Sequence, residues 1–340
     1  MTNSILIIGP AWIGDMVMAQ SLFKTLKLRY PEVQIDVLAP EWTFSLLKCM
    51  REVNQAIPTP LTHGQLHLAT RYRLAKQLQK NTYDQVIVLQ NSFKSALVPW
   101  FARIPKRTGW LGECRYFLLN DARRLDKTRY PRMVEQYVAL GLEKGETLPE
   151  ILPYPEFIVS PSARETTLSA FDLHLTQQPI LGLGVGAAFG PSKRWPIQYF
   201  GEVAKQKLAQ GWQVWLFGSE QDRSLTEVVM QMTQQQCSDF SGKTLLNQTL
   251  ALLSCTSGVV TNDSGLMHMA AALNKPLIAI YGPTSPAFTP PLSNHATILK
   301  LNLACQPCFA RVCPLKHHRC MTELSPAMVL SAMQTWDHPK

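Results

Sequence analysis

The sequence lacks the features that mark several common protein classes. None of its apolar runs approaches the ~20 residues that a membrane-spanning helix needs. The N-terminus has no basic region, and Asp15 interrupts what would be the apolar core of a signal peptide. Charged residues make up 17% of the 340 residues and hydrophobic ones 46%, which is typical of a folded globular protein and excludes a disordered one. We therefore expect a cytosolic protein whose eight cysteines are mostly reduced.

Two common nucleotide-binding motifs are also missing. The first apolar segment runs into Gly9, and Gly14 opens an amphipathic helix, which is the start of a phosphate-binding loop. A complete loop continues with Lys and then Ser or Thr, whereas this sequence has Asp15 and Met16. No strand is followed by G-x-G-x-x-G, and Asp36 falls inside the second strand instead of closing it. These absences argue against a P-loop NTPase and against a dinucleotide-dependent oxidoreductase.

Strand-like and helix-like segments alternate along most of the chain. This pattern predicts an α/β protein with parallel sheets that are covered by helices on both faces. The expected strands are 4–9, 34–40, 55–60, 83–90, 179–187, 212–219, 258–263 and 276–282, and the expected helices are 14–29, 42–50, 66–79, 92–101, 197–210, 221–234 and 265–273.

The alternation is interrupted once, at residues 145–178, which are rich in proline and have no clean period. We interpret this segment as an interdomain connection, and at ~150 residues per domain the length also suits two domains. We expect one Rossmann-like domain over 1–155 and a second over 175–322. A C-terminal helix over 323–340 can pack back towards the N-terminal domain.

The carboxyl ends of four strands carry glycines together with polar residues, and ligands of open α/β sheets bind at such ends. At one of them, Asp263 or Ser264 caps a helix whose free N–H groups and positive dipole end suit a phosphate. Gly265 allows close approach of a ligand, and His268 can donate from the next turn. Simple capping explains this motif taken alone. Together with Lys193 at a neighbouring strand end, the residues favour a diphosphate site.

The net charge of +9 favours an anionic partner, such as a phosphorylated substrate, an acidic membrane face or a nucleic acid. A solvated basic surface is equally consistent with the charge alone. A nucleic acid is disfavoured, because the basic residues are scattered and lack interleaved aromatic residues.

Four cysteines near the C-terminus have the spacing C-x2-C-x4-C-x6-C, with His317 and His318 among them. Four thiolates at such a spacing can form a tetrahedral structural zinc site, which we favour over two disulfides or four reduced thiols. No catalytic metal is assigned to these residues, which are Cys305, Cys308, Cys313 and Cys320.

Five segments carry a family resemblance: GPAWIGDMVMAQSLF, NSFKSALVPWFARIPKRTGW, LFGSEQD, TNDSGLMHMAAAL and YGPTSPAFTPPL. Together they closely resemble the bacterial ADP-heptose:lipopolysaccharide heptosyltransferases, which form glycosyltransferase family 9. The resemblance covers nearly the whole chain, from Ile5 to the C-terminal helix. NDSGLMH is typical of the whole family, whereas GPAWIGDM and NSFKSALVP point to the heptosyltransferase II branch.

The resemblance implies a GT-B glycosyltransferase, in which two Rossmann-like domains face each other across a central cleft. The N-terminal domain would hold a lipid-linked acceptor, and the C-terminal domain would hold ADP-L-glycero-D-manno-heptose. Family members invert the anomeric centre and need no cofactor for catalysis. The implied reaction adds a heptose to heptosyl-Kdo2-lipid A during synthesis of the lipopolysaccharide inner core. The implied location is cytoplasmic, with peripheral contact at the inner membrane.

The resemblance also implies roles for individual residues. Asp15 matches the general base, and Gly14 and Lys94 would contact the acceptor. Lys193 would both bind the donor and neutralise the departing ADP. The other positions that match the donor site are Asp263, Ser264, Gly265 and His268, with Ser219 and Glu220 as a looser match. Further basic residues that could face an anionic acceptor are Arg103, Lys106, Arg107, Arg115 and Arg132.

Two other functions fit part of the pattern. A family member that adds the first heptose would share the donor motif, so only the N-terminal half separates it from the second transferase. A non-catalytic nucleotide-sugar-binding protein would have no use for a base at Asp15. The structural alternative for Asp15 is a plain N-cap of its helix.

Overall fold

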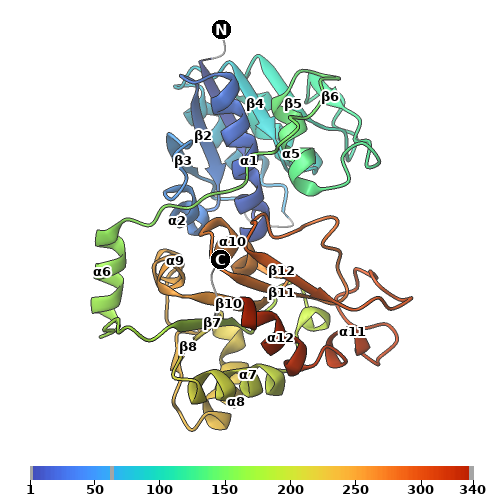
Figure 1. Ribbon diagram of the computed structural model, residues 1–340. Helices are drawn as coiled ribbons and strands as arrows, with labels where there is room; N and C mark the ends of the chain where they lie inside the picture. Colours follow the sequence, from blue (N-terminus) through green and yellow to red (C-terminus); the bar gives the residue numbers. More distant parts are fainter. Residues whose placement is uncertain (1–2, 62–64, 337–340) are drawn as a thin grey trace. The chain divides into compact units, whose positions relative to one another are not determined.

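The computed structural model describes residues 3–61 and 65–336 (Figure 1). The chain divides into two compact units, Met1–Pro155 and Glu156–Lys340, which we call the N-terminal and C-terminal units. None of the helices in the described residues has the length and apolar character required to span a membrane.

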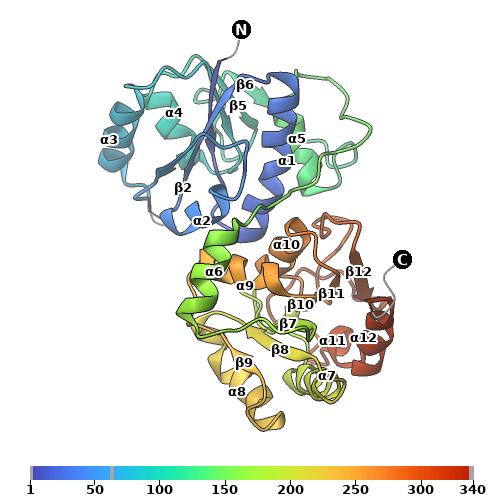
Figure 2. The same ribbon diagram turned by 60° about the vertical axis from the view of Figure 1, so that its left-hand side comes forward.

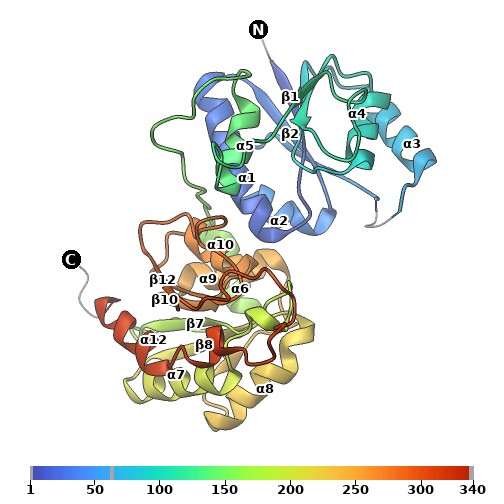
Figure 3. The same cartoon turned by 90° about the vertical axis from the view of Figure 1, so that its right-hand side faces the viewer.

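The described part of the N-terminal unit contains a six-stranded parallel sheet in the order β3-β2-β1-β4-β5-β6. Helices α1 and α5 cover one face of this sheet and α3 and α4 the other (Figures 2 and 3). The central strand β1 is apolar on both faces and is almost completely buried, as expected for a parallel strand between two helical layers. The elements are β1 (Ser4–Ile8), α1 (Ile13–Arg29), β2 (Gln34–Ala39), η1 (Glu41–Thr43), α2 (Phe44–Leu47), β3 (Gln55–Pro58), α3 (Leu68–Leu78), β4 (Gln85–Val88), η2 (Phe93–Ala96), α4 (Leu97–Phe101), β5 (Lys106–Trp110), β6 (Asp121–Arg123) and α5 (Met133–Gly141).

The C-terminal unit repeats this architecture, with a six-stranded parallel sheet in the order β12-β11-β10-β7-β8-β9 among its described residues. Helices α7, α8 and α12 lie on one face of the sheet, and α6, α9 and α10 lie on the other (Figure 1). The elements are α6 (Pro161–Ala170), β7 (Ile180–Gly184), η3 (Pro191–Lys193), α7 (Ile197–Ala209), β8 (Gln213–Phe217), η4 (Glu220–Asp222), α8 (Arg223–Met232), β9 (Ser238–Asp239), α9 (Leu246–Cys255), β10 (Gly258–Asn262), α10 (Gly265–Ala272), β11 (Leu277–Tyr281), β12 (Ala296–Lys300), α11 (Arg319–Thr322), α12 (Pro326–Met333) and η5 (Gln334–Trp336).

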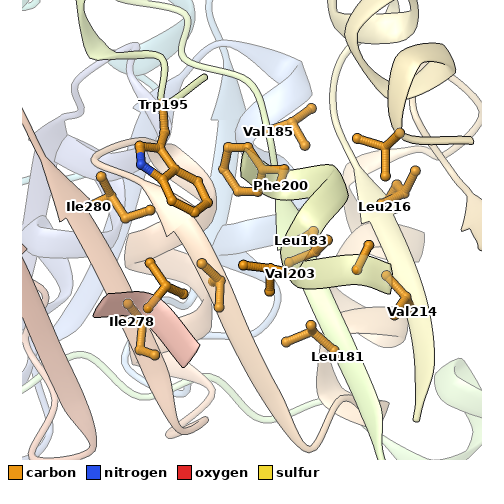
Figure 4. Packing of buried hydrophobic residues seen from close by; sticks show 14 of the residues in the cluster. Leu181, Leu183, Val185, Trp195, Phe200, Val203, Val214, Leu216, Ile278 and Ile280 are labelled. Carbon is orange, nitrogen blue, oxygen red and sulfur yellow. The ribbon is translucent and has the colours of Figure 1, made fainter. Parts of the chain in front are cut away.

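Trp195 anchors the turn before α7 in the core of the C-terminal unit (Figure 4). Its indole is 2% exposed and packs edge-on against Phe200, with the ring centroids 4.9 Å apart. The indole N–H donates to the carbonyl of Leu324 at 2.7 Å, and the backbone N–H donates to Asn262 Oδ1 at 3.0 Å. These contacts fix the position of Lys193, two residues earlier, relative to the end of β10.

The sequence-based expectation did not include β5, β6, α5, β9, α9 and β12. It also differs from the structure at the interdomain segment and at the C-terminal helix. Residues 145–178, expected to be a connection, contain α6, whose N-cap Ser160 accepts a hydrogen bond from the backbone of Ala163 at 3.2 Å. For the C-terminal helix, α12, the structure shows packing on α7 within the C-terminal unit. Val329 and Met333 of this helix are fully buried in the core of the C-terminal unit.

Candidate active site

Asp15 lies just beyond the carboxyl end of β1, as the third residue of α1. The N-cap of α1 is Trp12, so Asp15 is not the plain cap that was its structural alternative. A carboxylate in the first turn is stabilised by the positive end of the helix dipole. The side chain is half-buried. Burial, and secondarily the charge of Asp15, raises the pKa of the buried Tyr137 on α5, which places the carboxylate near that phenol.

A pocket of about 110 Å³ opens at the same end of the N-terminal sheet. Lys94 lines it and is half-buried, and Arg71 holds the Lys94 carbonyl with a hydrogen bond of 2.7 Å from Nη1. Gln90 lines the pocket too, and its Nε2 donates to the carbonyl of Gly9 at 2.7 Å. The other lining residues are Ile8, Ala11, Leu38, Pro40, Thr59, Leu61, Ser95 and Val98. The pocket therefore combines an apolar wall with two cationic side chains, which suits an anionic group on an apolar carrier.

Arg115 does not face a ligand as the sequence suggested, because it is 0% exposed. Its guanidinium donates to the carbonyls of Gln90 at 2.5 Å and Trp110 at 3.0 Å, and to Ser95 Oγ at 3.1 Å. Burial lowers the pKa of Arg115 to about 10. Arg115 therefore supports the loop that carries Lys94 and is not itself available to an acceptor.

Three of the other basic candidates also have partners within the N-terminal unit. Arg107 donates to the carbonyls of Leu118 and Ile104, both at 2.7 Å. Arg132 forms an ion pair with Glu135 at 2.7 Å. Lys106 lies 3.8 Å from a carboxylate oxygen of Glu143, whereas Arg103 is exposed.

Several residues that the sequence analysis assigned to a diphosphate site meet around Asp263, which follows β10 and is 4% exposed. Asp263 Oδ2 accepts from Lys193 Nζ at 2.6 Å and from Thr284 Oγ1 at 2.5 Å. The side chain of Lys193 is 13% exposed. The structure thus brings together the lysine and aspartate that the sequence placed at one site, and it adds Thr284, which follows β11.

Helix α10 begins at this point, with Ser264 as its N-cap and Gly265 as its first residue. The Ser264 hydroxyl makes no capping bond to the helix, and its Oγ lies 3.4 Å from Thr261 Oγ1. His268, one turn later, is 5% exposed, and burial lowers its pKa to about 4. The nearby charge of Lys193 lowers this pKa further, whereas Asp263 opposes the shift. His268 is therefore a neutral imidazole near pH 7, able to donate one hydrogen bond.

Ser219 and Glu220 lie at the end of β8. Ser219 donates from its backbone N–H and its hydroxyl to Asp222 Oδ2, at 2.9 and 2.7 Å. The exposed Glu220 forms an ion pair with Arg223 at 2.9 Å. Asp222 also lies 3.5 Å from a guanidinium nitrogen of Arg194, so it connects the strand ends of β7 and β8.

Thr284, Asn262 and Asp222 are site residues that the sequence analysis missed. Asn262 closes β10, and besides accepting from the Trp195 N–H it donates to the carbonyl of Val185 at 2.8 Å. A signal was present for each, because Asn262 and Thr284 end or follow strands and Asp222 stands three residues after Ser219, a capping-box spacing.

The four C-terminal cysteines belong to one segment, residues 305–320, which we call the cysteine loop; most of it is exposed or half-buried, whereas Cys320 is buried. All four are free thiols, and together with His317 and His318 they line a pocket of about 20 Å³. Within residues 3–61 and 65–336, however, no three His, Cys, Asp or Glu side chains are placed so that they could hold a metal ion. The geometry of the loop therefore gives no support to the zinc site that the spacing suggested.

Residues 71–319 match the model of glycosyltransferase family 9 (heptosyltransferase). The chain is 47% identical over 340 residues to lipopolysaccharide heptosyltransferase 2 of Salmonella typhimurium, with 97% of each chain covered. It is 49% identical over 310 residues to lipooligosaccharide heptosyltransferase 2 of Haemophilus influenzae, with 88% of each covered. The fold is similar to the structure of Escherichia coli ADP-heptose lipopolysaccharide heptosyltransferase II, with a TM-score of 0.88, 44% identity and 98% of each chain covered.

Proposed function

The chain belongs to glycosyltransferase family 9, the heptosyltransferases, and on this basis we propose that it transfers a heptose from ADP-heptose to an acceptor that already carries one heptose. The observation that carries the proposal is a sequence identity of 47–49%, over 88–97% of the chain, to relatives that are named heptosyltransferase 2. The acceptor is heptosyl-Kdo2-lipid A, a precursor of the lipopolysaccharide inner core. The Asp263 cluster of the C-terminal unit binds the diphosphate, and the pocket beside Lys94 receives an anionic group of the acceptor.

Asp15 acts as the general base in this proposal. An acceptor hydroxyl is a weak nucleophile at neutral pH, and Asp15 takes its proton while the oxygen forms a bond to C1 of the heptose. The bond between C1 and the β-phosphate oxygen breaks on the opposite face, and its electron pair leaves with ADP. Attack on the opposite face inverts the anomeric configuration. A positioned base of this kind contributes ~10²–10⁴-fold to the rate.

The C-terminal unit stabilises the charge that grows on the departing ADP. Lys193 supplies an ammonium group, and the first turn of α10, from Gly265, supplies backbone N–H groups and the positive end of a helix dipole. His268 can donate one hydrogen bond to the diphosphate as a neutral imidazole, because its low pKa keeps it uncharged near pH 7. Ser219 and Glu220 lie at the end of β8, and in this proposal they contact the nucleotide of the donor.

The proposal is tested by incubating the protein with ADP-heptose and with acceptors that carry either no heptose or one heptose. Product is expected from the acceptor with one heptose. Product from the heptose-free acceptor alone would instead assign the chain to the first addition.

We also propose that the N-terminal unit contacts the inner face of the inner membrane through a surface on α3 and α4, the α3–α4 surface. Tyr72, Trp100 and Phe101 form an aromatic group there, with Phe101 5.6 Å from Tyr72 and 5.1 Å from Trp100 between ring centroids. Lys76 lies over the Tyr72 ring at 5.6 Å, and Arg103 is exposed directly after α4. Exposed aromatic rings mixed with cations are typical of proteins that bind anionic lipid surfaces.

The same two helices line the pocket beside Lys94, through Arg71 on α3 and Val98 on α4. Contact of the α3–α4 surface with lipid would therefore bring a lipid-linked acceptor close to its pocket. The fraction of protein that sediments with phosphatidylglycerol vesicles should fall for Trp100→Ser and stay unchanged for Trp42→Ser. Trp42 is a matched control because it is 50% exposed, similar to the 45% of Trp100, but lies outside this surface. Equal sedimentation of the two variants would refute the assignment.

A further inference from the structure

The cysteine loop is fastened to the turn that carries Lys193. The backbone N–H of Ser192 donates to the carbonyl of Arg311 at 3.2 Å, and the Ser192 hydroxyl donates to the carbonyl of Ala310 at 2.5 Å. A ring nitrogen of His318 lies 2.7 Å from the carbonyl oxygen of Ser192. Most of the loop is exposed or half-buried, yet these bonds hold its middle beside the donor residues.

This attachment brings a second cation to the same aromatic ring as Lys193. Lys193 Nζ lies 5.0 Å from the centroid of the Phe189 ring, and Arg311 Cζ lies 5.6 Å from it. Gly190, next to Phe189, is packed so closely against the backbone of Arg311 that a Cβ atom would collide with it. The place of Arg311 is therefore set by backbone packing, although its guanidinium is exposed.

The charges of the donor site make this position significant. Lys193 is already paired with Asp263 at 2.6 Å, and Arg194 is paired with Asp222 at 3.5 Å. Each of these pairs has no net charge, whereas a nucleoside diphosphate carries two or more negative charges. Within the described residues, Arg311 forms no salt bridge, so its charge is uncompensated.

We propose that Arg311 is a donor-binding residue that supplies the uncompensated positive charge for the diphosphate. The inference rests on the proposed function only in that the nucleotide is ADP. A guanidinium can donate two parallel N–H bonds to phosphate oxygens, which makes it well suited to binding a diphosphate. In this proposal the cysteine loop positions the Arg311 guanidinium over the Phe189 ring, which Lys193 also contacts.

The test compares the binding of ADP and of adenosine, measured by titration calorimetry. The variants are Arg311→Ala, Arg311→Lys and, as a control with the same loss of charge from the same loop, Lys316→Ala. Lys316 is exposed and does not line the pocket beside Ser192. Alanine keeps the backbone and Cβ of residue 311, which are the atoms that pack against Gly190.

Arg311→Ala should weaken ADP binding by about tenfold and leave adenosine binding within about twofold, because only ADP carries the diphosphate. Arg311→Lys should recover part of the affinity, and the affinity of Arg311→Ala for ADP should depend less on salt. An unchanged ADP affinity in Arg311→Ala, or an equal loss in Lys316→Ala, would overturn the role of Arg311 while leaving the proposed function intact. If the unaltered protein does not bind ADP, the proposed function fails, and this inference fails with it.

Discussion

Replacement of Lys193 should affect stability and catalysis by two separable routes. The Lys193 ammonium lies 2.6 Å from a carboxylate oxygen of the buried Asp263, and no other salt bridge to Asp263 is found among residues 3–61 and 65–336. Lys193→Met removes this charge but keeps most of the side chain's length and apolar packing. Asp263 then retains the hydrogen bond from Thr284 and loses its counter-charge. Breaking a buried ion pair from one side costs ~3–5 kcal/mol, and we expect the lower end because Lys193 is 13% exposed and Thr284 remains.

The double variant Lys193→Met/Asp263→Asn separates the two routes. It leaves no uncompensated buried charge, so urea unfolding should show that it recovers most of the lost free energy of unfolding. Catalysis should not recover, because negative charge still grows on ADP with no ammonium to meet it. The assay is kcat at saturating ADP-heptose, with Lys205→Ala as a control, since Lys205 is an exposed lysine on α7 that should cost no more than ~0.5 kcal/mol.

Two results would refute this reasoning. If Lys193→Met unfolds like the unaltered protein, the ion pair with Asp263 is not the stabilising contact that the structure shows. If kcat at saturating donor is unchanged and only the donor KM rises, Lys193 contributes uniform binding and does not stabilise the leaving group.

Three further predictions concern other residues of the two units. Asp15→Asn should lower turnover by ~10²–10⁴-fold and leave the Kd for ADP unchanged, and turnover near that of the unaltered protein would exclude Asp15 as the base. The pKa of His268 is lowered from 6.5 to about 4, so the contribution of this residue to stability is complete above pH 6.5 and is lost as the pH falls towards 4. The free energy of unfolding, measured at several pH values, should decline by up to ~3 kcal/mol over this range, and His268→Gln should lack this decline. Arg115→Lys should raise the acceptor KM by about tenfold, at a cost of ~2 kcal/mol of stability, without changing the Kd for ADP, because the guanidinium supports the loop of Lys94; weakened ADP binding would contradict that role.

The buried apolar strands made most of the fold predictable. β1, β2, β4, β7, β8, β10 and β11 are all short runs of buried apolar residues, and their alternation with helices predicted two parallel sheets. Helices α5 and α9 were not predicted either, although both bury several apolar residues. Other elements that were not predicted carry little such signal. β9 has two residues, Ser238 and Asp239, and β6 has three, whereas β12 is largely exposed. Helix α6 begins at the Ser160–Pro161 pair, which is a typical N-cap and first helical residue. It was not predicted because the surrounding sequence is rich in proline and has no clear helical period.

The site was predictable only as far as residues stand at strand ends. Lys193 and Asp263 meet because the carboxyl ends of parallel strands lie at one edge of the sheet. Their expected roles came from the resemblance to motifs of the family. Whether a cation is buried or exposed depends on tertiary packing, which the sequence does not reveal. Arg115 and Lys94 look alike in the sequence, yet one is fully enclosed by carbonyl oxygens and the other lines a pocket.

The central claim is most directly tested by one transfer measurement on the unaltered protein with ADP-heptose and an acceptor that carries a single heptose. Mass spectrometry of the acceptor and quantification of ADP should show one added heptose for each ADP released, and the heptose-free acceptor should give little product. Asp15→Asn, run in parallel, should give neither the added heptose nor the ADP at a comparable rate. ADP release without growth of the acceptor, or transfer to the heptose-free acceptor alone, would contradict the account.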